Sequence, residues 1–444
     1  MAVRADKIDD YIRSEMAKRQ IPGLTLGVFK DGKPVKMAAY GKSDLELNTP
    51  VTIDDLFEIG SCTKQFTAAA TLLLAERGKL SIEDPVSKWI PEAPASWSQL
   101  TLRHLLFQMS GLQDYALVPG VGLTDSYDRA TWFSKMAPLP MDFEPGAAWA
   151  YSNTNYALLG YVVEKASGVP YTQFVTDNIL KPLGMTHTVF VDPYAVIPHR
   201  SHGFMVDSGS VIRAPYSGGG IQSDGTLAST IGDLEKWDQA LRERKILSPA
   251  SYALMWSRAK LNSGRTRAYG TGWFLSQLWE PDYVGHGGNS SGYSAGICRY
   301  TKAGITVLLL CNLYPVSGEP MGKHIAEIVD PSLKAVAPNP APDPDSARTG
   351  EVRDAMLKLG SGTPDGTVME DEVVAPLKTA RAKQFPSPYA ALKDIKSIAF
   401  CSELPNGDDK WLTYRVETAK GDYTLRVLWS KAGKLASAAL TPVS

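Results

Sequence analysis

The most strongly apolar stretch of the chain begins just after Gly60 and ends at Gly78. Apart from Lys64 and Gln65, nearly every position between these two glycines is apolar or small until Glu76 and Arg77. An apolar run without a polar stripe predicts a helix that is buried on most sides. Gly78 suits the left-handed position that closes such a helix. We therefore expect the rest of the fold to be organised around this helix.

Shorter patterns before and after this helix predict a sheet and further helices. Residues 24–30 and 34–41 have the composition of two strands, and the turn-forming pair Asp31-Gly32 joins them into a hairpin. Two more strands are expected at 294–300 and 305–311. Helices are expected at 6–19, 102–106, 156–166, 231–244 and 321–329.

A Pro-rich stretch separates the last hundred residues from the rest of the chain. Residues 336–350 are predicted to form an extended linker, which gives a first domain of residues 1–335 and a second of residues 351–444. In the second domain a helical stretch around 370–381 precedes four segments with alternating apolar and polar residues, near 397–402, 412–418, 423–429 and 435–441. This pattern predicts a helix and an antiparallel meander. The charged residues are scattered there, so no chemistry is assigned to this domain.

The composition is that of an ordinary globular protein of two or three domains, with 444 residues, 44% hydrophobic and 21% charged. A net charge of -1 gives no electrostatic reason to expect nucleic acid or an anionic membrane as a partner. No apolar run reaches the roughly 18 residues that a membrane span requires, so none is predicted.

The cysteine pattern argues against metal and cofactor chemistry. None of the four forms a CxxC pair, and they show no ligand spacing with the six histidines. We therefore expect no zinc site, no disulfide framework and no cofactor. As written, the chain has no signal peptide, which predicts a cytoplasmic protein. Val3-Arg4-Ala5 nevertheless fits a cleavage site, and trimming before Asp6 would predict a periplasmic or secreted form.

Ser61 and Lys64 lie at the N-terminal end of the central helix, three residues apart. One turn of helix brings the hydroxyl and the amine within reach of each other. A serine needs a proton acceptor nearby to act as a nucleophile, and a lysine is an acceptor only in its neutral form, which burial favours. The positive end of the helix dipole also favours negative charge on a substrate oxygen. This predicts Ser61 as nucleophile and Lys64 as its base.

The Ser-x-x-Lys tetrapeptide alone is a weak signal, because about one or two copies are expected by chance in a chain of ordinary composition. A second copy runs from Ser257 to Lys260 without an apolar helix behind it. Tyr-x-Asn, in contrast, occurs once, at Tyr151 and Asn153. A phenol can carry a proton between nucleophile and leaving group, and an amide can hold a substrate carbonyl or the lysine.

A glycine-rich segment provides the third group of candidates. Four of the eight residues at 285–292 are glycine, and glycine within a strand allows another backbone or a ligand to approach closely. This suits a substrate lying along the strand edge, with a strand N–H and the Ser61 N–H forming an oxyanion hole. The candidate substrate and oxyanion residues are Asn153, His286, Gly287, Gly288 and Asn289.

In their order and spacing, Ser61-x-x-Lys64, Tyr151-x-Asn153 and His286-Gly287-Gly288 resemble the serine hydrolase family of class C β-lactamases, low-molecular-weight penicillin-binding DD-peptidases, family VIII carboxylesterases and D-aminopeptidases. Two accessory segments, His104-Leu105-Leu106 with Ser110-Gly111-Leu112 and Glu144-Pro145-Gly146, strengthen the resemblance, which covers roughly residues 6–332. It implies a multi-domain α+β protein of the β-lactamase/transpeptidase-like fold. An antiparallel sheet flanked by helices would face a helical subdomain across a cleft.

The resemblance also implies a role for each candidate. Ser61 would be the acylated nucleophile and Lys64 its base or proton relay. Tyr151 would protonate the leaving group and activate water for deacylation. Asn153 would orient the substrate, and Asn289 would lie near the second oxyanion N–H.

The third motif departs from the family, because His286 stands where β-lactamases and DD-peptidases usually have the lysine of Lys-Thr-Gly. A histidine is mostly neutral at pH 7, and Gly287 lacks the threonine hydroxyl, so strong β-lactamase or carboxypeptidase activity is not expected.

These features predict a serine hydrolase that acts through an acyl-enzyme on small-molecule esters, amides or peptides, as a carboxylesterase does. A D-aminopeptidase, a DD-peptidase, a weak β-lactamase and an acyltransferase stay as alternatives within the same chemistry. From another class, the protein could be a penicillin-binding sensor without turnover or an interaction protein. The C-terminal domain could cover the cleft, shape specificity or pair chains into a homo-oligomer.

Overall fold

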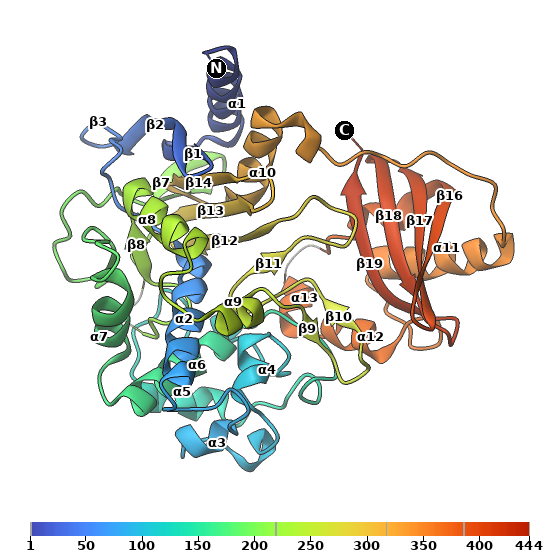
Figure 1. Cartoon of the computed structure of the whole chain (residues 1–444), viewed down its shortest axis with the longest axis horizontal. Helices are drawn as coiled ribbons and strands as arrows, with labels where there is room; N and C mark the ends of the chain where they lie inside the picture. Colours follow the sequence, from blue (N-terminus) through green and yellow to red (C-terminus); the bar gives the residue numbers. More distant parts are fainter. Residues whose placement is uncertain (1, 218–219, 317, 385–386, 444) are drawn as a thin grey trace.

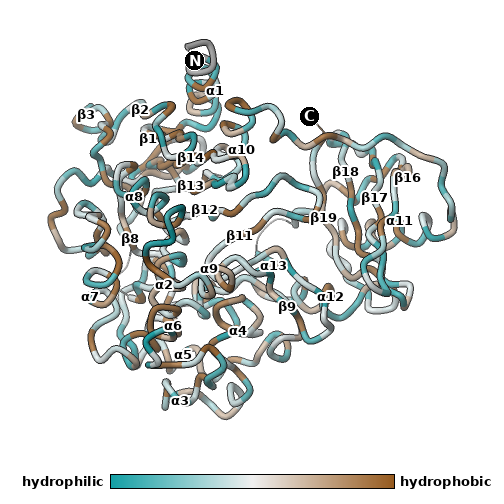
Figure 2. Tube along the Cα trace, viewed as in Figure 1, coloured by the Kyte–Doolittle hydropathy of each residue, from teal (hydrophilic) through white to brown (hydrophobic). Residues whose placement is uncertain are grey.

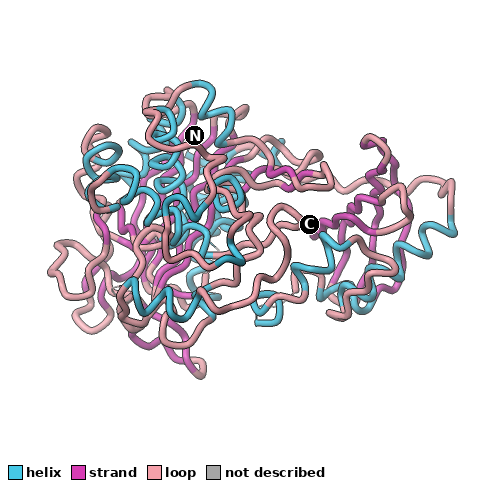
Figure 3. The backbone as a smooth tube through the Cα atoms, turned by 90° about the horizontal axis from the view of Figure 1, so that it is seen from below, coloured by secondary structure: helices cyan, strands magenta, loops and turns pink. Residues whose placement is uncertain are grey.

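The computed structural model of the protein describes all residues except 1, 218–219, 317, 385–386 and 444. It contains a large body, residues 2–335, and a C-terminal domain, residues 346–443, which lies to one side of the body in both views (Figures 1 and 3). Within the described ranges, no helix is long and apolar enough to cross a bilayer.

A seven-stranded antiparallel sheet forms one part of the body. Its strand order is β11-β12-β13-β14-β1-β2-β3. The hairpin of β1 and β2 therefore pairs, through β1, with β14, a strand from the last part of the body. The strands are β1 (Gly23–Lys30), β2 (Lys33–Asp44), β3 (Thr49–Pro50), β11 (Phe274–Leu275), β12 (Val284–Ser290), β13 (Tyr293–Tyr300) and β14 (Ile305–Cys311).

Helices cover both faces of this sheet and build the remainder of the body. They are α1 (Ala2–Arg19), α2 (Thr63–Glu76), α3 (Val86–Trp89), α4 (Leu102–Leu106), α5 (Arg129–Met136), α6 (Asn153–Ser167), α7 (Tyr171–Val175), α8 (Ile231–Arg242), α9 (Pro249–Met255) and α10 (Gly318–Val329). Short 3₁₀ or π turns are η1 (Gly60–Cys62), η2 (Ala95–Trp97), η3 (Tyr115–Leu117), η4 (Thr176–Leu180) and η5 (Pro331–Leu333). Three small sheets join β4 (Phe57–Glu58), β8 (Leu227–Ser229) and β5 (Val189–Phe190); β15 (Leu313–Tyr314), β6 (Phe204–Asp207) and β7 (Ser210–Arg213); and β9 (Ala259–Lys260) and β10 (Thr266–Arg267).

The unbroken apolar run of β14 follows from its central position. Successive side chains of a strand point to opposite faces of the sheet. Val307 and Leu309 pack in the core with residues of α1 and α10, whereas Leu308 and Leu310 pack in the larger core that contains α2 and α8. Both faces of the strand are therefore buried, and none of its positions faces solvent. The hydropathy of each segment can be followed in Figure 2.

The central helix α2 packs against α6 in the larger core, and twelve of its residues are buried. Gly78 follows it with a φ of 65°, the left-handed conformation expected of a helix-ending glycine. The helix is preceded by the turn η1, where Gly60 also has a positive φ, of 48°. The N-terminal end of α2 thus lies next to the sheet, at the level of β12.

The C-terminal domain has its own hydrophobic core, built between helices and a four-stranded meander of order β16-β17-β18-β19. Its elements are α11 (Ser346–Gly360), α12 (Asp371–Leu377), α13 (Ala380–Gln384), the turn η6 (Ala390–Asp394), and β16 (Ile395–Asn406), β17 (Asp409–Thr418), β18 (Gly421–Trp429) and β19 (Leu435–Pro442). The α+β class and the antiparallel C-terminal sheet predicted from the sequence are confirmed.

Two differences from the predicted helices bear on the linker and on the site. Helix α11 was not predicted and begins at Ser346, inside the stretch expected to be linker, where the Asp345 side chain caps it by accepting from the Arg348 N–H. Helix α6 begins at Asn153 rather than at Tyr156. The N–H of Asn153 donates to Asp114 Oδ1 at 3.3 Å, so this helix start is capped by a carboxylate from a distant segment.

Candidate active site

Ser61 and Lys64 lie where the turn η1 meets α2, and their side chains are in contact. Ser61 is half-buried and Lys64 is fully buried. Lys64 Nζ is 3.0 Å from Ser61 Oγ, 2.7 Å from Asn153 Oδ1 and 2.8 Å from the Asp224 carbonyl oxygen. These three oxygens fix the amine beside the hydroxyl, in the arrangement that a nucleophile and its base require. The second Ser-x-x-Lys copy forms no such turn, because Ala259 and Lys260 lie in the short strand β9.

Tyr151 lies beside this pair, in the segment that leads into α6. Lys64 Nζ is 5.0 Å from the centre of the Tyr151 ring, and the ring is stacked on Phe274 at 6.2 Å. The phenol oxygen is buried and has no hydrogen-bond partner among the described residues. A buried polar atom without a partner carries a free-energy cost and needs an explanation, of which a catalytic role is one. The Tyr151 ring therefore lies beside the Ser61–Lys64 pair, but its phenol oxygen makes no hydrogen bond with Ser61 Oγ or Lys64 Nζ.

Asn153, the first residue of α6, contacts the lysine. Its Oδ1 accepts from Lys64 Nζ, while its Nδ2 donates to Asp114 Oδ2 at 3.3 Å. The amide is therefore held between a cation-forming group and a carboxylate. Of the two roles considered for this amide, the structure contains the contact with the lysine.

His286 faces the aromatic side of the site. Its ring centre is 4.9 Å from that of Phe274 and 6.0 Å from that of Tyr151. Its Nδ1 donates to the Gly287 carbonyl at 2.5 Å. Burial, together with the nearby Lys64, lowers the pKa of His286 to about 4. The imidazole is therefore neutral at pH 7 and supplies no fixed positive charge for a substrate carboxylate.

Glycines allow β12 and the turn η1 to approach each other closely. A Cβ on Gly288 would lie 1.8 Å from the Ile59 carbonyl oxygen, and a Cβ on Gly60 would lie 2.5 Å from the Asn289 nitrogen, so β12 and η1 meet backbone to backbone. β11 pairs only with Val284 and Gly285, and beyond them the outer edge of β12 faces η1. The Asn289 N–H is thereby brought next to the turn that carries Ser61.

Two of the predicted site residues point away from this edge. A Cβ on Gly287 would contact Glu319 of α10 at 3.4 Å, and the Asn289 side chain is exposed and accepts from Ser294 Oγ at 2.7 Å. Alternation along the strand explains this, because His286 and Gly288 share one face and Gly287 and Asn289 the other. Only the backbone of Asn289 faces the turn.

Sequence reasoning missed three polar groups that surround the lysine. The Asp224 carboxyl is buried and accepts from the Tyr115 hydroxyl at 2.7 Å, and its burial raises its pKa to about 6 although Lys64 and Tyr115 act in the opposite direction. Asp114 is buried next to Asn153. No motif marked these residues, since they lie in irregular segments whose proximity to Lys64 depends on the fold.

Arg381 is the third missed group and corrects an assignment. It comes from α13 of the C-terminal domain, to which the sequence assigned no chemistry. Its Nη1 forms an ion pair with Asp114 Oδ2, and its guanidinium carbon is 5.0 Å from the centre of the Tyr151 ring. The C-terminal domain therefore contributes a side chain to the immediate surroundings of the site.

Cys62, next to the nucleophile, is fully buried and its Sγ donates to the His286 carbonyl at 3.2 Å. Burial raises its pKa well above that of an ordinary thiol, which leaves it as a packing residue. In the described part of the chain, no group of three His, Cys, Asp or Glu side chains is arranged to hold a metal ion.

This geometry agrees with comparisons to known proteins. A family model described as Beta-lactamase matches residues 8–330. The chain belongs to the Beta-lactamase family. Penicillin-binding protein 4* of Bacillus subtilis is 33% identical to it over 322 residues, which are 66% of this chain and 69% of that protein. Protein flp of Staphylococcus aureus is 27% identical over 319 residues, 69% of this chain, and the match spans 63% of the length of that relative.

Solved structures extend the likeness of this Beta-lactamase-family chain to its C-terminal part. The octameric penicillin-binding protein homologue from Pyrococcus abyssi has a TM-score of 0.65 and 25% identity, and the match covers 95% of this chain and 90% of that one. A penicillin binding protein from Bacillus halodurans has a TM-score of 0.62 and covers 71% of this chain and 98% of its own. At 24% identity the second supports the fold alone.

Two buried groups of this Beta-lactamase-family site make opposite predictions about stability and pH. The pKa of His286 falls on folding to about 4. Its contribution to the free energy of unfolding is therefore full above pH ~6.5 and is lost as the pH falls toward 4. The pKa of Asp224 rises on folding to about 6. Its contribution to the free energy of unfolding is therefore full below pH ~4 and is lost as the pH rises toward 6. Over this window the two dependences oppose each other in the wild type.

Single variants should separate these dependences. As the pH is raised from 4 to 6, we expect the free energy of unfolding of Asp224→Asn to rise relative to that of the wild type. Over the same change, that of His286→Gln should fall relative to the wild type, each by on the order of 3 kcal/mol. Urea unfolding at several pH values measures this, and comparison with the wild type cancels the other titrating groups. Identical pH slopes in all three proteins would contradict the assignment.

Proposed function

We propose that this protein is a serine hydrolase that forms an acyl-enzyme on Ser61 and acts on ester or small amide substrates. The single observation that carries the proposal is the 3.0 Å contact between Ser61 Oγ and the buried Lys64 Nζ at the start of α2. Membership of the Beta-lactamase family supports the reaction class.

In the proposed acylation, Ser61 Oγ attacks the substrate carbonyl carbon and its proton passes to Lys64 Nζ, which acts as the base. The backbone N–H groups of Ser61 and Asn289 stabilise the oxyanion. As the bond to the leaving group breaks, Tyr151 donates its proton to the leaving oxygen or nitrogen and is reprotonated from Lys64. In deacylation, water attacks the acyl carbon, its proton returns through Tyr151 or Lys64, and Ser61 leaves with a proton.

The neutral His286 supports a preference for esters over substrates that present a carboxylate. A neutral imidazole at position 286 offers no permanent cation to a substrate carboxylate, which would lose its hydration on binding. This favours carboxylesterase-like activity over DD-peptidase or β-lactamase activity.

We expect kcat/KM for a short-chain p-nitrophenyl ester to exceed that for nitrocefin and for a D-alanine amide. A steady-state panel of these three substrates, with a fluorophosphonate probe to titrate active Ser61, measures the order. A higher kcat/KM for the D-alanine amide would instead assign the protein to the peptidase branch. Product formed only in an amount equal to that of the protein would identify a sensor without turnover. Formation of a new ester from an added alcohol would identify an acyltransferase.

Slow acylation by β-lactams is the second candidate activity. It is supported by similarity to proteins named for penicillin binding, in Bacillus subtilis and among solved structures. A labelled penicillin that modifies Ser61 without turnover would support it. The pairing of chains through the C-terminal domain stays a prediction.

A further inference from the structure

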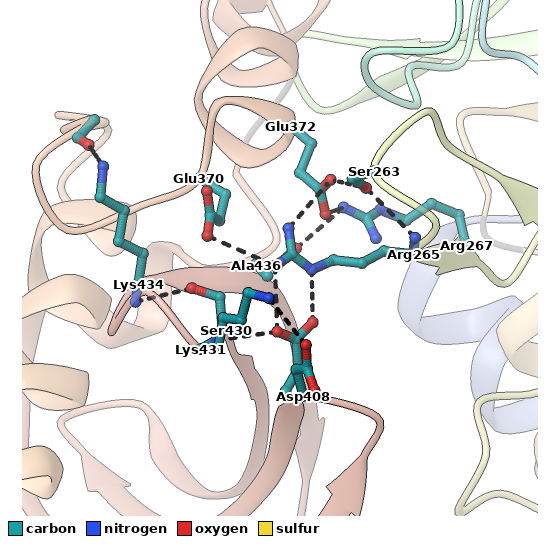
Figure 4. Close-up of polar contacts among 12 residues, drawn as sticks. Ser263, Arg265, Arg267, Glu370, Glu372, Asp408, Ser430, Lys431, Lys434 and Ala436 are labelled. Carbon is teal, nitrogen blue, oxygen red and sulfur yellow. Dashed lines mark hydrogen bonds and ion pairs between the residues drawn. The ribbon is translucent and has the colours of Figure 1, made fainter.

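The C-terminal domain is attached to the body by a cluster of charged residues, which we call the interdomain clamp: Arg265, Arg267, Glu372 and Asp409. Arg265 Nε is 2.7 Å from Asp409 Oδ2, and Arg267 Nη2 is 2.8 Å from Glu372 Oε1 (Figure 4). The Glu372 side chain is only 4% exposed and also accepts from Ser263 Oγ at 2.5 Å. Partly buried, shared charge pairs of this kind define a geometry more strictly than isolated surface pairs do.

The clamp is close in sequence to the residue that reaches the active site. Glu372 lies on α12, and Arg381 follows nine residues later on the short helix α13. Thr379 links them, since its Oγ1 accepts from the Ala382 N–H at 3.1 Å and donates to the Pro376 carbonyl at 2.9 Å. The segment from the clamp to Arg381 is therefore held at both ends.

Arg381 meets the body at a small cavity of about 50 Å³ that Asp114, Tyr151 and Thr379 also line. The Asp114 side chain is 1% exposed, and its other donors, the N–H groups of Ala116 and Asn153 and the Asn153 amide, are at 3.2 to 3.3 Å. The contact with Arg381 joins opposite charges, so it is the strongest restraint on the Asp114 carboxylate.

A continuous series of contacts runs from Asp114 to the nucleophile. Asp114 Oδ2 accepts from Asn153 Nδ2, Asn153 Oδ1 is 2.7 Å from Lys64 Nζ, and Lys64 Nζ is 3.0 Å from Ser61 Oγ. Displacing Asp114 would therefore displace the amide that holds the lysine. Arg381 also lies against the Tyr151 ring, where a guanidinium stabilises the ring position through its quadrupole.

We propose that Arg381 is a positioning residue of the active site and that docking of the C-terminal domain through the interdomain clamp sets the catalytic geometry. The proposal rests on the proposed function for its kinetic consequence. Its structural consequence, the ordering of Asp114 and Asn153, does not depend on which substrate is used. The catalytic body is thus complete only when the C-terminal domain is docked.

The kinetic test uses Arg381→Ala and Arg381→Lys in the full-length protein. For Arg381→Ala we expect kcat for a p-nitrophenyl ester to fall about 10- to 100-fold with KM changed by less than about threefold, because a displacement near 1 Å in a site costs about this much in rate. Arg381→Lys keeps the charge and should recover part of the rate. Added millimolar guanidinium should raise the rate of Arg381→Ala but not that of the wild type.

Two further variants separate this effect from general loss of structure. Arg348→Ala removes an arginine that pairs with Glu403 inside the C-terminal domain, and we expect it to keep the wild-type kcat. Arg265→Ala loosens the clamp without touching the site, and we expect it to lower kcat in the same direction as Arg381→Ala. Thermal unfolding of each variant verifies that the protein is folded.

Amide hydrogen exchange provides a readout that does not depend on turnover. In Arg381→Ala the Asn153 and Ala116 amides, which donate to Asp114, should exchange faster, whereas in Arg348→Ala they should not. An unchanged kcat together with unchanged exchange in Arg381→Ala would overturn the proposal. A wild type that neither hydrolyses the ester nor reacts with the fluorophosphonate would overturn the proposed function instead, and the exchange rates would then decide the Arg381 proposal alone.

Discussion

Replacing Ser61 by alanine should lower the turnover of a short-chain p-nitrophenyl ester by about 10⁴-fold or more. The reason is that Lys64 Nζ, the proposed base, lies 3.0 Å from Ser61 Oγ, the proposed nucleophile. The substitution removes one small polar atom from a half-buried position, so the free energy of unfolding should change little. Steady-state kcat and the mass of the protein after fluorophosphonate treatment measure the result.

The second Ser-x-x-Lys copy offers a matched control. Ser257 Oγ donates to the Leu254 carbonyl at 2.8 Å and lies outside the site, so Ser257→Ala should keep both ester turnover and fluorophosphonate labelling. Full activity in Ser61→Ala, or loss of labelling in Ser257→Ala, would show that the nucleophile has been assigned to the wrong serine.

Tyr151→Phe should separate activity from stability. Loss of a positioned proton-transfer group lowers kcat by about 10²- to 10⁴-fold. The phenol oxygen is buried without a hydrogen-bond partner among the described residues, so removing it abolishes no contact and should leave the protein as stable as the wild type or slightly more so. Ester kinetics and urea unfolding on the same preparation measure both quantities.

Tyr171→Phe is the matched control for this variant. The Tyr171 hydroxyl is buried and lies 2.7 Å from Thr67 Oγ1, away from Ser61, so its removal should cost about 1 kcal/mol of stability and leave kcat unchanged. A Tyr151→Phe variant with wild-type kcat would remove the phenol from the mechanism, even if the Ser61 result holds.

The contribution of Arg381 changes the role of the C-terminal domain in this Beta-lactamase-family protein. A domain joined by a Pro-rich segment would by default be free to move relative to the body. Here the interdomain clamp and the Arg381–Asp114 pair provide two attachment points, one outside the site and one next to it. Specificity and rate can therefore respond to substitutions in residues that lie far from Ser61 in the sequence.

The sequence by itself determined the local chemistry of the site. The apolar run after Gly60 predicted the buried helix, and the three-residue spacing within one turn necessarily put Ser61 and Lys64 side by side. Alternation predicted the C-terminal meander. These predictions succeeded because each depends on contacts between residues that are close in the chain.

Only the tertiary structure decided which groups surround the lysine. Asp114, Asp224 and Arg381 carry no local signal, since a single carboxylate or guanidinium is most often a solvated surface group. Their positions follow from long-range packing: Asp114 caps the start of α6, the Asp224 carbonyl accepts from Lys64, and the clamp directs α13 toward Tyr151. The early start of α6 likewise depends on a neighbour from a distant segment, Asp114. Periodicity within one element says nothing about the partners that the fold brings to it.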